Sequence, residues 1–167
     1  MHDKLTQSDI ARMEEEIEHR KLVLRPQLLE HVKEARAHGD LSENFEYHAA
    51  KREKNKNESR IRFLERMIRT AEVISDASAE DEAGINNTVT VEFVEDGSIE
   101  VFKIVTTVRG NSLEGLISNE SPLGKALLGH KEGDTVHVQV NDTVSYDVRI
   151  TRIDNTVDDG SDKLRSF

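Results

Sequence analysis

The sequence predicts an α+β protein in two parts: an N-terminal antiparallel coiled-coil hairpin and a C-terminal antiparallel sheet domain with one short helix. The first observation is a change of period, because apolar residues recur every three or four positions up to about residue 75 and every second position from residue 88. The second is composition: of the 167 residues, 35% are hydrophobic, 34% are charged and only 4% are aromatic. Such a chain is poorly suited to one thick core, whereas long solvated helices suit it well.

The first helix is expected from about Ser8 to His38. Ser8 with Asp9 suits its start and Gly39 suits its end. Pro26 falls inside the helix, where it removes one backbone hydrogen bond and should bend the helix locally. The apolar residues are separated by steps built from threes and fours, as in an amphipathic helix: Ile10, Met13, Ile17, Leu24, Leu28, Val32 and Ala35.

The second helix is expected from about Asp40 to Ser75. Its heptad seam consists of Tyr47, Ala50, Lys54, Asn57, Ile61, Leu64, Ile68 and Ala71. The connection at residues 39–42 is too short for anything except antiparallel neighbours, so residues 1–75 are predicted to form a helical hairpin. Helices of about 30 residues span roughly 45 Å. The turn is therefore expected at the end of a long rod.

Residues 76–87 are small, acidic and aperiodic, which indicates a linker. Residues 88–154 are expected to form the second domain, with one helix that Ser121 caps and Pro122 begins. Residues 155–167 are polar and are expected to be disordered. Five segments of the second domain alternate as strands do: 88–94, 99–106, 113–118, 134–140 and 144–153.

Charge and composition exclude several classes of function. The chain has no cysteine, and no run of apolar residues exceeds three, which argues against thiolate metal sites and membrane spans. A cytoplasmic protein without a membrane partner is expected. The net charge of −10 argues against general binding of duplex nucleic acid. The charge is uneven, however: residues 51–69 hold eight Lys or Arg against three acids, and residues 72–100 hold nine acids and no Lys or Arg. A local basic patch could touch nucleic acid where another body brings it close.

The acidic residues at the expected turn have two readings. Asp40 and Glu43 fit a capping box, in which Asp40 is the N-cap of the second helix and Glu43 the third helical residue. Alternatively, both carboxylates project from the end of the rod toward another molecule. Two carboxylates are too few for Mg²⁺, which prefers six oxygens. Delivered into a site that already holds a metal and phosphate, they could complete a two-metal centre for phosphodiester cleavage.

The basic residues near the turn also have two readings. Arg36, Lys51 and Arg52, with Lys56 and Arg60 further along, are either a solvated helix face or a surface that holds an RNA backbone beside the acids. The histidines lack the spacing of a zinc hydrolase. The aromatic residues near the turn, Phe45 and Tyr47, are expected to pack rather than to stack on bases.

Two long motifs then suggest a family. The stretch RPQLLEHVKEARAHGDLSENFEYHAAK resembles the hairpin tip of the GreA/GreB family of bacterial transcript-cleavage factors, and LISNESPLGKALLGHKEGDTVHV resembles a segment of their C-terminal domain. The resemblance covers nearly the whole folded chain and is closer to GreA. Phe45 departs from it, because the family usually has Ala at that position.

The resemblance implies a function. The hairpin would enter the secondary channel of a backtracked RNA polymerase, and the C-terminal domain, of the family's prolyl-isomerase-like fold, would dock at the channel rim. Asp40 and Glu43 match the acids that help to hold a catalytic Mg²⁺ jointly with the polymerase, so that the polymerase cuts the 3′ end of its own nascent RNA. The factor would be neither an enzyme nor the owner of a cofactor, and a monomer is expected. The remaining site residues would be a basic patch that contacts RNA (Arg36, Lys51 and Arg52), further tip contacts (Ser42 and Tyr47) and a docking segment (Ser121 and Pro122).

Three alternatives remain at this point. A regulator could enter the same channel and inhibit, although the intact acid pair argues against it. A true prolyl isomerase would need an aromatic pocket, for which residues 80–154 offer only Phe93, Phe102 and Tyr146. A plain coiled-coil scaffold would not need acids clustered at its turn.

Overall fold

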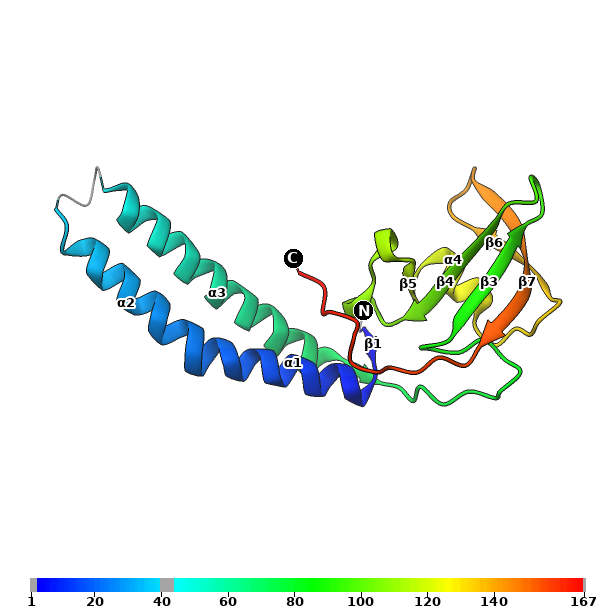
Figure 1. The fold of residues 1–167 in the computed structure, drawn as a ribbon, viewed down its shortest axis with the longest axis horizontal. Coiled ribbons are helices and arrows are strands. Elements are labelled where there is room, and N and C mark those ends of the chain that lie inside the picture. Colours follow the sequence, from blue (N-terminus) through cyan, green and yellow to red (C-terminus); the bar gives the residue numbers. More distant parts are fainter. Residues whose placement is uncertain (1–2, 40–43, 167) are drawn as a thin grey trace. The chain divides into compact units, whose positions relative to one another are not determined.

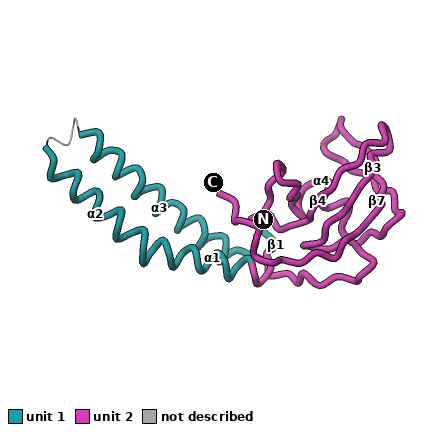
Figure 2. Tube along the Cα trace, in the orientation of Figure 1, with its two compact units in different colours: residues 1–3, 9–71, 167 teal, residues 4–8, 72–166 magenta. Residues whose placement is uncertain are grey.

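The structure is a computed structural model that describes residues 3–39 and 44–166. The chain divides into two compact units, shown in Figure 2. Among the described residues, the hairpin unit comprises residues 3, 9–39 and 44–71, and the sheet unit comprises residues 4–8 and 72–166. Each unit is described by itself.

The hairpin unit contains two antiparallel helical arms. The first arm consists of α1 (Gln7–His19), a π-helical segment η1 (Arg20–Leu24) and α2 (Arg25–Arg36), and the second is α3 (Phe45–Thr70). Figure 1 shows α2 and α3 side by side. The expected hairpin is confirmed, but its first arm is not one uniform α-helix. The π-helical segment ends at Leu24, two residues before Pro26, whose ring would collide with the carbonyl of Leu22 in a regular helix. The wider turn gives the proline ring room.

The predicted seam between the arms is largely confirmed. Met13 is fully buried, and Val32, Ala35, Tyr47, Ile61 and Leu64 are all at most 9% exposed. The second arm is shorter than the sequence predicts, because α3 ends at Thr70. The chain then forms a two-residue strand, β2 (Glu72–Val73), which pairs in parallel with β1 (Lys4–Leu5). The sequence analysis missed this pair, since two residues carry no period.

The sheet unit is built on five strands in the order β5-β4-β3-β7-β6. Their bounds are β3 (Thr88–Phe93), β4 (Ile99–Val105), β5 (Leu116–Ser118), β6 (Thr135–Gln139) and β7 (Ser145–Asp154), close to the predicted segments. The sheet is antiparallel except that β4 and β5 run in parallel, which differs from the fully antiparallel expectation. Two short 3₁₀ turns, η2 (Thr107–Arg109) and η3 (Ser112–Glu114), lie between those strands and return the chain in the same direction.

One face of this sheet carries the apolar core. Alternate residues of the strands point into it, and α4 (Pro122–Leu127) adds Leu123 and Leu127. Gly124 allows α4 to pack closely against the backbone at Ser118, because a Cβ on Gly124 would lie 2.0 Å from the carbonyl oxygen of Ser118. The buried members of the cluster are Ala83, Val89, Val91, Ile104, Leu123, Leu127, Val136, Val138, Val148 and Ile150.

Two segments without regular secondary structure also belong to the sheet unit. In the stretch expected to be a linker, Ala83 is buried and its N–H donates to the carbonyl of His130 at 2.8 Å. Residues 155–166, for which the sequence predicts disorder, run along the sheet unit, and the side chains of Asp158 and Asp162 are only 5% and 9% exposed. Among the described residues, no helix combines the length and the apolar character needed to cross a membrane.

Candidate functional site

Asn44 organises the start of α3 at the hairpin tip. Its side-chain oxygen accepts a hydrogen bond from the backbone N–H of Tyr47 at 3.0 Å, as an N-cap does. Its amide nitrogen donates to the carbonyl of Ala35 at 2.6 Å, which ties the two arms together. The N-cap of α3 is therefore Asn44, and the reading that assigned this cap to Asp40 is wrong. Asp40, Ser42 and Glu43 themselves, and most of the predicted turn at 39–42, lie outside the described residues.

A second contact joins the arms at the tip. Nδ1 of His38 lies 3.1 Å from Oε2 of Glu46, and both side chains are exposed. Pairs of this kind on the surface contribute little, about 0–1 kcal/mol. Phe45, which the sequence analysis expected to pack, is 86% exposed, so that expectation is wrong. It is the first residue of α3, directly after the N-cap Asn44.

Tyr47 is the centre of a positively charged cluster. Its side chain is packed between the arms, as expected, and belongs to a small apolar cluster with Val32 and Ala35. The guanidinium carbon of Arg36 lies 5.5 Å from the ring centroid and Nζ of Lys51 lies 6.0 Å from it. The hydrogen bond from Arg36, with the nearby charge of Lys51, lowers the pKa of the Tyr47 hydroxyl below its usual range.

The structure thus brings together two of the three predicted RNA contacts. Arg36 on α2 and Lys51 on α3 share the Tyr47 ring, and both are exposed. Arg52 is exposed on α3, about 100° around the helix from Lys51. Arg60 does not belong to this surface, because its side chain is only 7% exposed and pairs with Glu16. The sequence analysis grouped it wrongly with the exposed bases.

Arg60 instead takes part in a polar network in the middle of the hairpin unit. Oε2 of Glu16 accepts hydrogen bonds from Nε of Arg60 and from Nε of Arg20, both at 2.7 Å. Arg20 also donates to the side-chain oxygen of Asn57 at 2.8 Å, and Asn57 donates back to the carbonyl of Arg20 at 3.3 Å. That carbonyl belongs to the π-helical segment. The sequence signals for this network are the polar residue Asn57 at a seam position and the i, i+4 spacing of Glu16 and Arg20.

Burial and hydrogen bonding act in opposite directions on Glu16. Partial burial raises its pKa, but the hydrogen bonds and charges of Arg60 and Arg20 outweigh this effect and leave the pKa below the usual range for Glu. Glu16 is therefore held as a carboxylate at neutral pH. In this part of the hairpin, paired charges are added to the buried apolar side chains of Met13, Ile61 and Leu64.

The predicted docking segment lies in the sheet unit. Oγ of Ser121 accepts from the N–H of Gly124 at 3.1 Å and donates to the carbonyl of Ser118 at 2.6 Å. Ser121 is the N-cap of α4 and Pro122 is in its first turn, which confirms the predicted start of this helix. The described residues contain no group of three or more His, Asp or Glu side chains placed to hold a metal ion.

Comparisons with known proteins cover nearly the whole chain. Residues 4–73 match the family model described as "Transcription elongation factor, N-terminal", and residues 78–155 match "Transcription elongation factor, GreA/GreB, C-term". The chain is 46% identical over 154 residues to the transcription elongation factor GreA of Streptococcus sanguinis, with 92% of this chain and 96% of that protein covered. It is 45% identical to the GreA of Streptococcus gordonii, with 91% and 95% covered.

Two solved structures resemble this chain over most of its length. The transcription factor Gfh1 is 27% identical, with 92% of this chain and 97% of that chain covered and a TM-score of 0.45. A GreA/GreB elongation factor from Nitrosomonas europaea is 18% identical, with 92% and 98% covered and a TM-score of 0.39. The two family matches and the sequence relatives together establish that this chain belongs to the GreA/GreB family of transcription elongation factors.

Proposed function

We propose that this factor stimulates RNA polymerase to cleave the 3′ end of its own nascent RNA after backtracking. The hairpin enters the secondary channel of the polymerase, and Asp40 and Glu43 reach the active site. The factor has no turnover of its own. The observation that carries the proposal is the cap made by Asn44: it accounts for the start of α3 without Asp40, so the capping role that competed with a catalytic one is already filled.

The chemistry of the donors suits a shared Mg²⁺. Carboxylate oxygens are the ligands that Mg²⁺ prefers, but Asp40 and Glu43 supply too few of them for six-fold coordination. The remaining ligands must come from the polymerase, the RNA and water. A second Mg²⁺ held by Asp40 and Glu43 with the polymerase would supply an activated water and would stabilise the charge that develops on the phosphate. The part of this chain is to bring the two carboxylates to the site on a stiff support.

The cluster around Tyr47 supplies a site for the RNA backbone. Arg36 and Lys51 come from different arms, and their shared contact with the Tyr47 ring holds the two positive charges close together. An RNA phosphate could contact both, with Arg52 as a further contact on α3. The alternative, a solvated basic face without a ligand, predicts that neutralising Lys51 leaves cleavage unchanged.

The sheet unit would bind the rim of the channel. We place its contact at the segment that begins α4, Ser121 and Pro122, because the cap and the proline fix the backbone there. One copy of the chain suffices, since a single hairpin fills one channel. The factor would work in the cytoplasm, where its polymerase is found.

Cleavage in stalled complexes tests the proposal. Backtracked complexes of a cognate polymerase with 3′-labelled RNA would be mixed with the wild type, Asp40→Asn or Glu43→Gln. The wild type should release short 3′ fragments, and each variant should slow their release at least about a hundredfold, the scale of losing a transition-state contact. Glu46→Gln is the matched control, because it removes an exposed carboxylate from the first turn of α3.

The outcomes separate the rival functions. Wild-type binding that slows elongation without releasing fragments would identify an inhibitor of the same channel. A folded wild type that neither binds nor cleaves would refute the proposal. Equal loss in Glu46→Gln would mean that negative charge at the tip matters in general and that the Asp40 and Glu43 pair has no special part.

A further inference from the structure

The C-terminal tail extends beyond the part of the chain that matches the family. That match ends at residue 155, whereas the structure describes the chain to residue 166. We refer to residues 156–166 as the C-terminal strap. Its sequence, TVDDGSDKLRS, has no period and offers little to an apolar core. Its contacts are polar and are distributed along its length.

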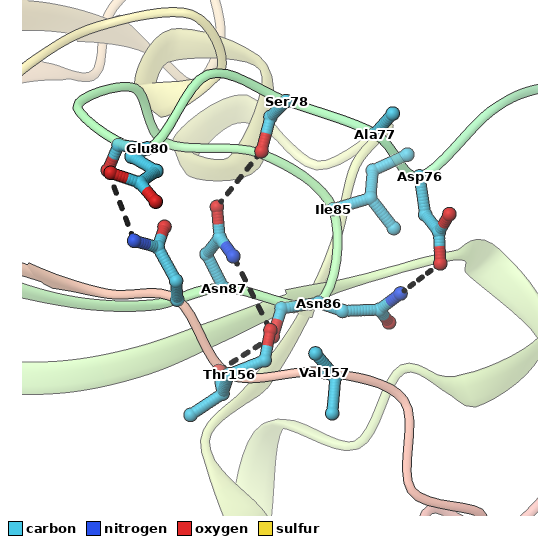
Figure 3. Close-up of a pocket in the computed structure, with 10 residues that line it drawn as sticks. Asp76, Ala77, Ser78, Glu80, Ile85, Asn86, Asn87, Thr156 and Val157 are labelled. Atoms are coloured by element: carbon cyan, nitrogen blue, oxygen red, sulfur yellow. Dashed lines mark hydrogen bonds between the residues drawn. The ribbon is translucent and has the colours of Figure 1, made fainter.

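The strap is first bound at Thr156. As Figure 3 shows, Thr156 lies beside Asn86 and Asn87. Its hydroxyl donates to the carbonyl of Asn86 at 2.6 Å, and the side-chain amide of Asn87 donates to the carbonyl of Thr156 at 3.3 Å. The two asparagines precede β3, so the strap begins on backbone that is part of the sheet unit.

Arg109 is the central contact of the strap. Its side chain is fully buried, although arginine is almost never buried without a charged partner. One guanidinium nitrogen lies 3.2 Å from Oδ2 of Asp162 and 4.0 Å from Oδ2 of Asp158. Both carboxylates belong to the strap. Nζ of Lys103 also lies 3.0 Å from Asp162, so this carboxylate bridges two cations.

Asn86 contacts the same guanidinium nitrogen of Arg109, Nη1, that faces the strap carboxylates. Its side-chain oxygen accepts from Arg109 at 2.8 Å, and its own backbone N–H donates to the carbonyl of Ile104 in β4 at 2.7 Å. Asn86 has a φ of 75°, which Asn tolerates better than most residues. Nη1 of Arg109 is thus shared between Asn86, just before β3, and the carboxylates of the strap. Removing a partner from a buried charge is strongly destabilising.

The end of the strap forms part of a groove. The backbone N–H of Arg165 donates to the carbonyl of Val108 at 2.6 Å. On both sides of that bond, the strap residues 163–166 line a groove of about 610 Å³ together with residues of the 110–121 segment, among them Leu113 and Ser121. Ser121 belongs to the segment that we place at the polymerase contact. The strap therefore contributes one wall of the groove in which that residue lies.

We propose that residues 156–166 form a strap that is anchored by the ion pair of Asp162 with Arg109 and keeps the groove beside Ser121 in the shape that binds the polymerase. That the groove binds polymerase rests on the proposed function, whereas the ion pair that anchors the strap rests on the structure alone. It assigns a role to a segment that lies beyond the family match. It also explains the burial of a charge at Arg109: the strap is its counter-ion.

Hydrogen exchange and polymerase binding of full-length variants test the two parts separately. Asp162→Asn keeps the shape of the side chain and removes its charge. The backbone amide of Arg165 should then exchange at least about tenfold faster than in the wild type, because opening of the strap becomes easier. The affinity for polymerase, measured by competition for backtracked complexes, should fall several-fold. Amides in the β3–β7 ladder should keep their protection, which shows that the variant is folded.

Asp159→Asn is the matched control. Asp159 is an exposed acid of the same strap, and its carboxylate accepts a hydrogen bond from Ser161. Asp159→Asn changes the net charge of the protein by the same amount as Asp162→Asn. It should leave both exchange at Arg165 and polymerase affinity within about twofold of the wild type. A similar effect of both variants would refute the specific anchor and point to net charge.

The remaining outcomes are decisive in different ways. If the Arg165 amide exchanges as fast in the wild type as in Asp162→Asn, the anchor is wrong. If protection is lost but affinity is unchanged, the strap has no part in binding and the inference fails there. If the wild type does not bind polymerase, the proposed function and the docking part of the inference fail together, while the exchange result still decides the anchor.

Discussion

The hairpin unit and the sheet unit are stabilised in different ways. The sheet unit has a continuous apolar cluster that joins β3, β4, β6, β7 and α4. The hairpin unit has a small apolar cluster near the tip, formed by Val32, Ala35 and Tyr47. In its middle, a network of charged and amide groups lies among the buried apolar side chains of Met13, Ile61 and Leu64. Apolar burial contributes stability without direction, whereas hydrogen-bonded charges also specify which residues face each other. The difference suits a hairpin that must hold its tip in register.

The largest effect is expected in the core of the sheet unit. Leu127 in α4 is fully buried, and Leu127→Ala should lower the free energy of unfolding by about 2–5 kcal/mol, from lost burial and the cavity left behind. Urea unfolding followed by amide signals of the sheet unit measures the change. Leu113→Ala is the control, because Leu113 is 97% exposed and should change stability by less than about 0.5 kcal/mol. If both variants lowered stability equally, the buried apolar cluster would not be what stabilises the sheet unit, and the proposed difference from the hairpin unit would fail.

The next effect is expected in the network of the hairpin unit. Arg60→Met removes one partner of a pair and leaves Glu16 with Arg20. Breaking a fully buried pair costs about 3–5 kcal/mol. Because the side chain of Glu16 is 23% exposed and keeps its second partner, we expect about 1–3 kcal/mol. Amide exchange along α3 measures this loss without interference from the sheet unit.

A double variant sharpens that prediction. Glu16→Leu with Arg60→Met replaces the pair by apolar side chains, a change that is often neutral or stabilising in other proteins. The double variant should therefore recover at least half of the stability that Arg60→Met loses. If instead the two losses simply add, the network contributes by packing of the long side chains and not by pairing.

Most of the fold follows from local patterns in the sequence. The five strands of the sheet and the short helix lie close to the predicted segments because alternation and capping are properties of neighbouring residues. The parallel pairing of β1 with β2 could not be predicted, since it joins residues 4–5 to 72–73. The burial of Arg60 likewise depends on Glu16, which is 44 positions earlier in the chain.

The candidate site shows the same division. Tyr47 was expected to pack, because it lies on the heptad seam, and it does. The N-cap was misplaced because Asp40, Ser42 and Asn44 all suit that position by residue type. The bond from Asn44 to the carbonyl of Ala35 favours Asn44, and that bond depends on the register of the two arms. The position of Arg36 and Lys51 around the Tyr47 ring depends on the register of the two arms as well.

A smaller effect is expected at the cap. Asn44→Ala removes both the cap and the tie between the arms, and should cost about 1 kcal/mol, felt at the tip rather than in the middle of the hairpin. Asn44→Asp keeps an oxygen for the cap but removes the donor to Ala35. It should therefore be more stable than Asn44→Ala but less stable than the wild type. Exchange at the Tyr47 amide reports both variants. If Asn44→Asp behaves as the wild type, the tie to Ala35 adds nothing.

The smallest effect is a dependence of hairpin stability on pH. The pKa of Glu16 is lowered in the folded protein although burial by itself raises it, because hydrogen bonds from Arg60 and Arg20 favour the carboxylate. A group whose pKa is depressed on folding contributes stability above its unfolded pKa, usually about 4.3 for Glu, and this contribution is lost as the pH falls through the folded value.

The stability of the hairpin should therefore decrease on acidification below about pH 4.5, and Glu16→Gln should flatten that part of the curve. The far-UV circular dichroism of the helices, measured in urea at several pH values, gives both curves. Other carboxylates titrate in the same range, so the informative quantity is the difference between the wild type and Glu16→Gln. Glu14→Gln, on an exposed position of α1, is the control and should follow the wild type. Parallel curves for Glu16→Gln and the wild type would mean that the charges of the network do not stabilise the hairpin, and the contrast with the sheet unit would then reduce to the size of the apolar clusters.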